Sequence, residues 1–230
     1  DRDLILDVHD LVRPYVAPIV LKSEDGEPED QNGRRPKLLF ESDHNRKITW
    51  DHLLRQTSDW EGTLWGKPEW ADRPSDDRST WGTRPRFEPG TRYEYNDTRV
   101  NLLALVAASV WRRPLPEVLR EYVMDPIGAS PTWRWHGYDN SWVILDGRPV
   151  QSVSGGAHWG GGMMLNTFDQ ARFGLLTMHK GMWNGQRLIS EEWIDMSTTP
   201  GEVNRNSGYM NFSLNTDQRR YPNAPEYTRT

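Results

Sequence analysis

The clearest periodic pattern in the sequence covers residues 97–112, where apolar side chains recur at the spacing of one face of an α-helix. Asp97 and Thr98 begin this segment, and both are residue types that cap helix N-termini. The pattern therefore predicts a buried helix with Asp97 or Thr98 as its N-cap. Its apolar positions are Val100, Leu103, Ala107, Val110 and Trp111.

Four shorter segments also carry helical signals. Residues 49–57 place three apolar side chains on one face, and residues 116–124 begin with a proline at the first helical position. Residues 167–180 open with a capping-box spacing that makes Thr167 the expected cap, and they close before a glycine. A further short helix is expected after Ser190, because two glutamates occupy its first turn.

The N-terminal third is less regular. Residues 4–13 favour a short helix, which the prolines at positions 14 and 18 would end. Residues 22–37 are nearly all polar and predict a solvated loop or an insertion. Residues 58–89 combine four tryptophans with glycines, prolines and charges, a composition typical of a lid or a binding loop.

Strands are expected mainly in the second half of the chain. Residues 142–153 predict a hairpin that turns at Asp146-Gly147. A second tight turn is expected at Asn184-Gly185, and residues 209–215 alternate between apolar and polar as a strand does.

The composition excludes several function classes. A formal net charge of -5 gives no basic surface for nucleic acid, and the longest apolar stretch is too short to cross a bilayer. The absence of cysteine excludes disulfides and thiolate chemistry, and the six histidines show no metal-ligand spacing. We therefore expect no metal or organic cofactor.

Three segments, in this order, resemble one family. Residues 53–58, Leu-Leu-Arg-Gln-Thr-Ser, are similar to an L-L-x-H-T-S segment. Residues 89–97, Pro-Gly-Thr-Arg-Tyr-Glu-Tyr-Asn-Asp, resemble P-G-x-x-F-x-Y-S-N, and residues 160–174 resemble a glycine-rich turn followed by D-x-A-R-F-G. These are segments of the serine β-lactamase-like family, which includes class C β-lactamases, penicillin-binding proteins, esterases and 6-aminohexanoate-oligomer hydrolases.

The resemblance implies an α+β fold of the β-lactamase/transpeptidase type, with an antiparallel sheet flanked by helices beside a largely helical region. Residues 1–230 are then expected to be the internal part of a single domain, incomplete at both ends. The family's nucleophile lies in an S-x-x-K motif, and no serine in this sequence is followed three residues later by lysine. We therefore expect the parent protein to be the hydrolase and this chain alone to be inactive.

Within the resemblance, Tyr95 takes the position of the catalytic tyrosine that shuttles a proton for the serine. Asp97 stands where the family usually has asparagine. An ionised aspartate cannot donate a hydrogen bond to a substrate, and its charge raises the pKa of a nearby tyrosine. This difference argues against β-lactams as the natural substrate, and the N-cap interpretation of Asp97 stays open beside a site role.

Three further residues are candidates for contact with substrate. His158 and Trp159 lie in a glycine-rich stretch, residues 155–162, that permits close approach of the backbone to a ligand, although a structural turn explains the glycines as well. Trp65 represents the tryptophan-rich loop, whose large apolar faces suit either ligand contact or packing.

The sequence thus predicts a serine hydrolase acting on a small-molecule ester, amide or peptide-like substrate through an acyl-serine. Two alternatives remain: a non-catalytic binding or regulatory member of the same fold, and a tryptophan-rich carbohydrate-binding module. The resemblance is compatible with a periplasmic or secreted location, while the chain shows no signal peptide. The oligomeric state is left open.

Overall fold

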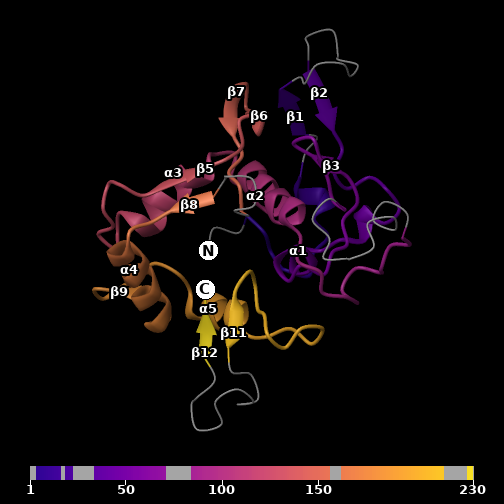
Figure 1. Cartoon of the computed structure of the whole chain (residues 1–230). Coiled ribbons are helices and arrows are strands. Elements are labelled where there is room, and N and C mark those ends of the chain that lie inside the picture. Colours follow the sequence, from indigo (N-terminus) through magenta and orange to yellow (C-terminus); the bar gives the residue numbers. More distant parts are fainter. Residues whose placement is uncertain are drawn as a thin grey trace.

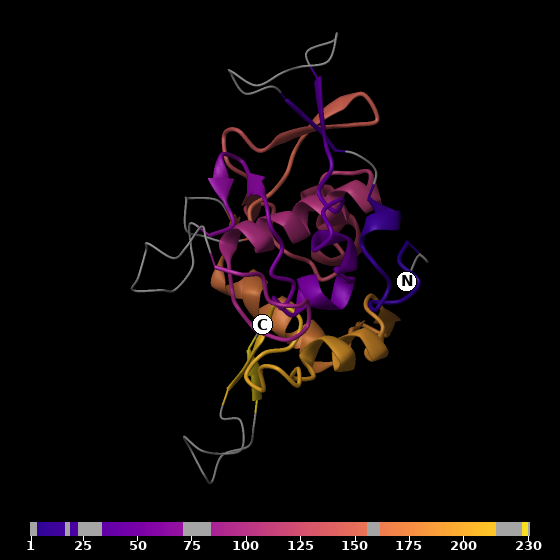
Figure 2. The same cartoon turned by 90° about the vertical axis from the view of Figure 1, so that its right-hand side faces the viewer.

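The computed structural model describes residues 4–16, 19–22, 34–70, 84–155, 162–214 and 227–229. Helix α2 (Asp97–Trp111) runs through the centre of the molecule, with α1 (Trp50–Leu54) beside it (Figure 1). The views of Figures 1 and 2 agree that a small sheet lies on one side of α2 and the C-terminal elements lie on the other. Helices and small antiparallel sheets together make the α+β class that the sequence predicts.

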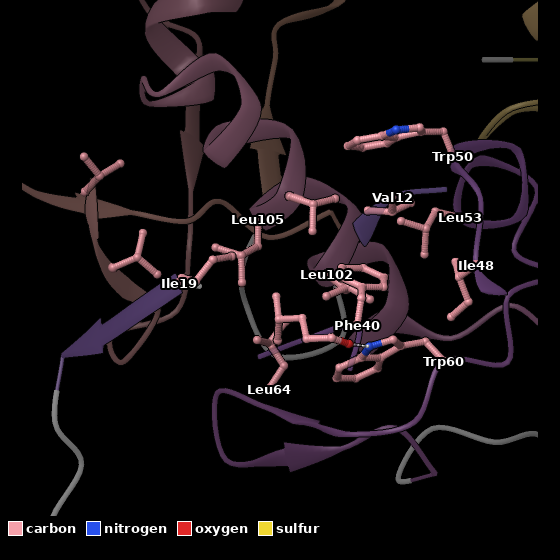
Figure 3. Packing of buried hydrophobic residues seen from close by; sticks show 14 residues of the cluster. Val12, Ile19, Phe40, Ile48, Trp50, Leu53, Trp60, Leu64, Leu102 and Leu105 are labelled. Atoms are coloured by element: carbon pink, nitrogen blue, oxygen red, sulfur yellow. Dashed lines mark hydrogen bonds between the residues drawn. The ribbon is translucent and has the colours of Figure 1, made fainter. Parts of the chain in front are cut away.

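The main hydrophobic core forms where α1 and α2 meet the chain that precedes them. Leu102 and Leu105 of α2 are fully buried in the same cluster as Trp60, whose indole Nε1 donates to the carbonyl of Leu39 at 2.8 Å (Figure 3). Burying such a large aromatic side chain is a major favourable contribution in a chain with only 35% hydrophobic residues. Trp60 is therefore a core residue rather than an exposed aromatic platform.

The largest sheet has four antiparallel strands in the order β2-β1-β6-β7. The hairpin of β6 (Trp142–Leu145) and β7 (Arg148–Gln151) confirms the prediction for residues 142–153. Its turn residues have positive φ angles of 51° at Asp146 and 78° at Gly147, as a tight two-residue hairpin requires. Strands β1 (Ile19–Lys22) and β2 (Arg34–Lys37) pair with each other, so the ends of the predicted polar loop are strands.

The predicted helices are present with adjusted bounds. α1 is shorter than predicted, and α3 (Leu115–Leu119) continues into a π-helical turn, η4 (Arg120–Met124). α4 (Thr167–Met178) and α5 (Glu191–Thr198) follow, and Ser190 caps α5 as predicted. The short 3-10 helices η1 (Arg13–Tyr15) and η2 (Asn45–Lys47) complete the helical elements of the described residues.

The remaining strands are short and pair locally. β3 (Thr63–Leu64) pairs with β4 (Lys67–Pro68), and β5 (Arg134–His136) pairs with β8 (Gly162–Met164). The hairpin of β9 (Met182–Trp183) and β10 (Gln186–Arg187) turns at Asn184-Gly185, as predicted. β11 (Phe212–Leu214) pairs with β12 (Tyr227–Arg229).

Four sequence predictions are wrong in detail. Residues 4–13 form bends and turns instead of a helix, and the strand predicted for 209–215 begins only at Phe212. The cap of α2 is Asn96, whose side chain accepts from the amide of Arg99, so neither Asp97 nor Thr98 is the N-cap. In α4 the cap is Asn166 rather than Thr167. Asparagine caps as well as aspartate or threonine does, so spacing alone could not choose between neighbours.

A buried network of ion pairs fixes the start of α2. Arg99 is fully buried, and its Nη2 lies 2.5 Å from Asp59 Oδ1 and 3.3 Å from Glu69 Oε2. Arg84 contacts both oxygens of Asp59, at 2.7 and 2.8 Å, and reaches Glu94 at 3.3 Å. These residues come from three separate stretches of chain, so the network ties the loop after α1 to the segment that enters α2.

The charge of Asp59 is held by its surroundings. Burial alone would raise the pKa of this carboxyl, but the hydrogen bonds from Arg84, the charge of Arg99 and the amide of Phe87 outweigh burial. The pKa falls to about 2. Because the folded pKa is lower than the unfolded value of about 3.9, Asp59 contributes stability above that unfolded value and loses it as the pH falls towards the folded one.

We predict that Asp59→Asn lowers the free energy of unfolding by about 3–5 kcal/mol at neutral pH, because it leaves buried arginine charge without its carboxylate. The deficit should shrink as the pH falls from about 4 towards 2. Urea unfolding at several pH values measures both effects. Asp43→Asn is the matched control, because the Asp43 side chain is 97% exposed and should change stability by less than about 0.5 kcal/mol. An equal deficit at all pH values would contradict the assignment.

Candidate functional site

Tyr95 lies in the extended stretch that leads into α2. The next residue, Asn96, has φ -154° and ψ 126°, and in such a backbone alternate side chains point to the same side. This geometry brings the Tyr95 hydroxyl to the Asp97 carboxylate, with which it forms a hydrogen bond. Tyr95 is 38% exposed whereas Asp97 is buried. The pair therefore combines a solvent-accessible tyrosine with a buried carboxylate.

The surroundings keep Tyr95 protonated. Burial is the largest cause that raises its pKa above the ordinary value of 10.0, and the hydrogen bond to Asp97 and the charge of Asp97 raise it further. The nearby hydroxyls of Tyr93 and Tyr138 add smaller contributions. The prediction that Asp97 raises the pKa of Tyr95 is confirmed, and at neutral pH Tyr95 is a hydrogen-bond donor rather than a phenolate.

Gln56 holds the backbone on both sides of Tyr95. Its carbonyl accepts from the amide of Glu94 at 3.0 Å, and its side-chain Oε1 accepts from the amide of Asn96 at 3.3 Å. Its Nε2 donates to the carbonyl of Leu53 at 3.0 Å, which anchors the side chain to the end of α1. Gln56 is buried and has a positive φ of 56°, an unusual conformation for a residue with a Cβ.

A narrow pocket opens beside Tyr95, between the end of α1 and residues 207–212. Its volume is about 30 Å³, enough for one water molecule, and its walls include Tyr93, Tyr95, Met210 and Phe212. Ser207 also lines it and is hydrogen-bonded to Tyr93. A polar pocket of about 330 Å³ lies next to it, with Arg55 and Ser207 lining both pockets.

Of the other predicted contact residues, Trp65 is not brought to this pocket. Trp65 sits in the turn between β3 and β4 with a φ of 55°, packs partly against the main core and accepts from Asn140 Nδ2 at its carbonyl. His158 and Trp159 lie outside the described residues. Of the five predicted site residues, the structure therefore joins Tyr95 and Asp97 and places Trp65 elsewhere.

Several residues near Tyr95 carry no signal that sequence reasoning detected. Gln56 stands at the histidine position of the segment that resembles L-L-x-H-T-S. The resemblance identified this segment, but it gave no sign that Gln56 contacts the backbone next to Tyr95. Asn101, Tyr138 and Ser154 form a second polar cluster through hydrogen bonds of 3.1–3.2 Å. They are separated by up to 53 positions in the sequence, so no local motif could have joined them.

Neither a metal centre nor a membrane span is evident in the part of the chain that the structure describes. Its histidines, aspartates and glutamates form no group of three that could hold a metal ion. None of its helices has the length and apolar character needed to cross a membrane. The Tyr95–Asp97 hydrogen bond joins two groups that can hold and transfer a proton.

Comparisons with solved structures show the fold. Two similar structures have provisional functional names, one a beta-lactamase from Bacteroides dorei and the other a 6-aminohexanoate-dimer hydrolase from Bacillus anthracis. The first is 17% identical with a TM-score of 0.52, over 75% of this chain and 55% of that one. The second is 13% identical with a TM-score of 0.55, over 91% of this chain and 53% of that one. The chain thus spans little more than half of the length of either structure.

Sequence comparison shows the family. No curated protein matches the chain. The sequence model of the Beta-lactamase family, however, matches residues 6–210, which include α1, the Tyr95–Asp97 pair, α2 and the helix α4. This match covers most of the sequence and agrees with the fold and with the three segments that carry the resemblance, so the chain belongs to the beta-lactamase family.

Proposed function

We propose that the protein to which this chain belongs is a serine hydrolase that cleaves an ester, amide or peptide-like bond through an acyl-serine. The observation that carries the proposal is the Tyr95–Asp97 hydrogen bond, formed by a partly exposed tyrosine in the segment that resembles the family's tyrosine motif. Family membership and the fold support a hydrolase of this type.

The nucleophile must come from outside these residues, because no serine in the chain has a lysine three positions later. A hydroxyl nucleophile needs a group that accepts its proton as it attacks the carbonyl and returns a proton to the leaving group. We place the serine and its lysine in the part of the family fold that the chain does not span. In this proposal the 230 residues alone contain the proton-transfer pair but lack the serine that is acylated.

The raised pKa of Tyr95 shapes the proposed mechanism. A phenol that stays protonated cannot take up a second proton unless it releases its own. Asp97 accepts the hydrogen bond from Tyr95 and can receive that proton as the Tyr95 oxygen takes the proton of the serine. In the second half of the cycle Tyr95 protonates the leaving group and recovers its proton from Asp97. No net charge is left on the phenol at any stage.

The second candidate function is a non-catalytic binding or regulatory member of the family. Asp97 favours it, because this aspartate replaces the asparagine that donates to substrate in the family pattern. The two functions differ in one observable, the presence of a reactive serine. Labelling the full-length protein with an active-serine fluorophosphonate distinguishes them, because a non-catalytic member acquires no label.

We predict that Tyr95→Phe in the full-length protein lowers kcat for p-nitrophenyl butyrate by about 10²–10⁴-fold, the usual contribution of a positioned acid–base group. Steady-state kinetics measure the change. Tyr122→Phe is the control, because Tyr122 packs on Trp111 at the opposite end of α2 and should retain activity. Full turnover by Tyr95→Phe would remove the proposed role of this tyrosine.

We predict that Asp97→Asn lowers the pKa of Tyr95, because it removes an acceptor and a negative charge that both favour the protonated phenol. The pKa should stay above 10, since burial is the larger cause of its rise. Titration of ¹³Cζ-labelled tyrosine by NMR measures this shift in the chain without any need for turnover. An unchanged titration midpoint would show that the two side chains do not interact.

We predict that Gln56→Gly loosens Tyr95 without a large loss of stability, because glycine adopts the positive φ of this position freely. In the full-length protein kcat should fall about tenfold with little change in KM, as expected when a reacting group is misplaced. Asn184→Gly is the matched control, since it makes the same substitution type at a φ of 46° in the remote β9–β10 turn. Equal kinetics for both variants would contradict a positioning role for Gln56.

A further inference from the structure

Three partly exposed apolar side chains meet at the narrow pocket beside Tyr95. Tyr95 itself is 38% exposed, Met210 is 36% exposed and Phe212 is 48% exposed, and all three line this pocket. Leu54, the last residue of α1, forms a further apolar part of its wall. Exposed apolar side chains that gather around a concave surface mark a place where an apolar group of a ligand can be buried.

The turn that carries Met210 is firmly attached to two helices. The amide of Met210 donates to the carbonyl of Leu54 at 3.1 Å, and the amide of Tyr209 donates to the carbonyl of Ser197 in α5 at 2.7 Å. Gly208 lies so close to α5 that a Cβ added to it would be 2.2 Å from the Ser197 carbonyl oxygen. Met210 has a positive φ of 54°, an uncommon conformation for a residue with a Cβ. The turn therefore holds Met210 at the pocket in a defined position.

The polar side chains that follow α1 also line the pocket, but they already have partners within the protein. Arg55 Nε donates to Asp51 Oδ1 at 2.9 Å. The amide of Gln56 is hydrogen-bonded to the carbonyl of Leu53 and to the amide of Asn96. An apolar group that enters the pocket does not leave these polar atoms without a hydrogen bond, so the usual cost of burying them is avoided.

The polar pocket of about 330 Å³ has a different character. It shares Arg55 and Ser207 with the narrow pocket, and its other walls include His9, His52 and Glu202. A polar leaving group finds hydrogen-bonding side chains there, whereas the narrow pocket suits an apolar group of small size. The two pockets therefore offer separate places for the two parts of an amphipathic substrate.

We propose that the narrow pocket is an acyl subsite, which binds a short, unbranched apolar acyl chain, and that Met210 limits the length of that chain. The inference rests on the proposed hydrolase function. With the reacting bond next to Tyr95, the acyl chain enters the narrow pocket and the leaving group points towards the polar pocket. A volume of about 30 Å³ accommodates the end of a short chain only. Each methylene group that the pocket buries strengthens binding about fourfold.

The first test is kinetic and uses p-nitrophenyl esters with the full-length protein, so that the leaving group is constant. In the wild-type protein, kcat/KM should be about tenfold higher for the butyrate than for the acetate ester, and about tenfold lower for the octanoate than for the butyrate ester. Met210→Ala shortens the wall and should raise kcat/KM for the octanoate ester about tenfold, with the acetate value within about twofold of wild type. A gain for one ester cannot arise from misfolding.

Met178→Ala is the matched control. Met178 is 78% exposed near the end of α4 and does not line the pocket, so this variant should keep the wild-type preference for chain length. An unchanged preference in Met210→Ala, in a protein that hydrolyses the butyrate ester, would overturn this inference and leave the hydrolase proposal standing.

The second test is binding and needs no turnover. The probe is 2-pentanone, a ketone that has the propyl chain of a butyrate ester and cannot be hydrolysed. In the full-length protein with [methyl-¹³C]methionine, added 2-pentanone should shift the methyl resonance of Met210, identified by its loss in Met210→Ala, and leave that of Met178 unchanged. If the wild-type protein hydrolyses no ester, the hydrolase proposal fails, and an unshifted Met210 resonance would then overturn the apolar subsite as well.

Discussion

The buried guanidinium of Arg99 is the constraint on which the rest of the structure depends. An arginine without solvent exposure needs carboxylates around it, because an unpaired charge in the interior costs several kcal/mol. Asp59 and Glu69 form ion pairs with this guanidinium. For both carboxylates to reach Arg99, the chain that follows α1 and carries them must fold back over the first turn of α2. The helix that carries the candidate site is thereby fixed to the loop that supplies Trp60 to the core.

The same constraint explains why Tyr95 has a defined position in an extended segment. Glu94, on one side of it, faces Arg84, and Asn96, on the other side, donates to the carbonyl of Glu69 at 2.5 Å. Gln56 adds hydrogen bonds to the same two neighbours. A site residue with partly exposed side chain and fully anchored backbone combines access for a ligand with a fixed geometry, which catalysis by positioning requires.

Local signals predicted the elements well and the contacts poorly. The helix at 97–111 and the hairpin around Asp146-Gly147 follow from periodicity and turn chemistry, and both are present. The pairing of β1 with β2 was missed, because β2 (Arg34–Lys37) consists of three basic residues and a proline. Motif resemblance pointed to Tyr95, whereas Tyr138 and Arg99 depend on partners 16 to 40 positions away that no local pattern reveals.

Asp97 stands where the motif that residues 89–97 resemble, P-G-x-x-F-x-Y-S-N, ends in asparagine. An asparagine at this position offers a donor to the substrate and leaves the tyrosine free to ionise, whereas an aspartate offers only acceptors. In the mechanism that we propose, Tyr95 with its raised pKa needs a proton acceptor of its own before it can deprotonate a serine, and Asp97, its hydrogen-bond partner, is that acceptor. In the same proposal, a substrate lacks the donor that an asparagine at this position would give.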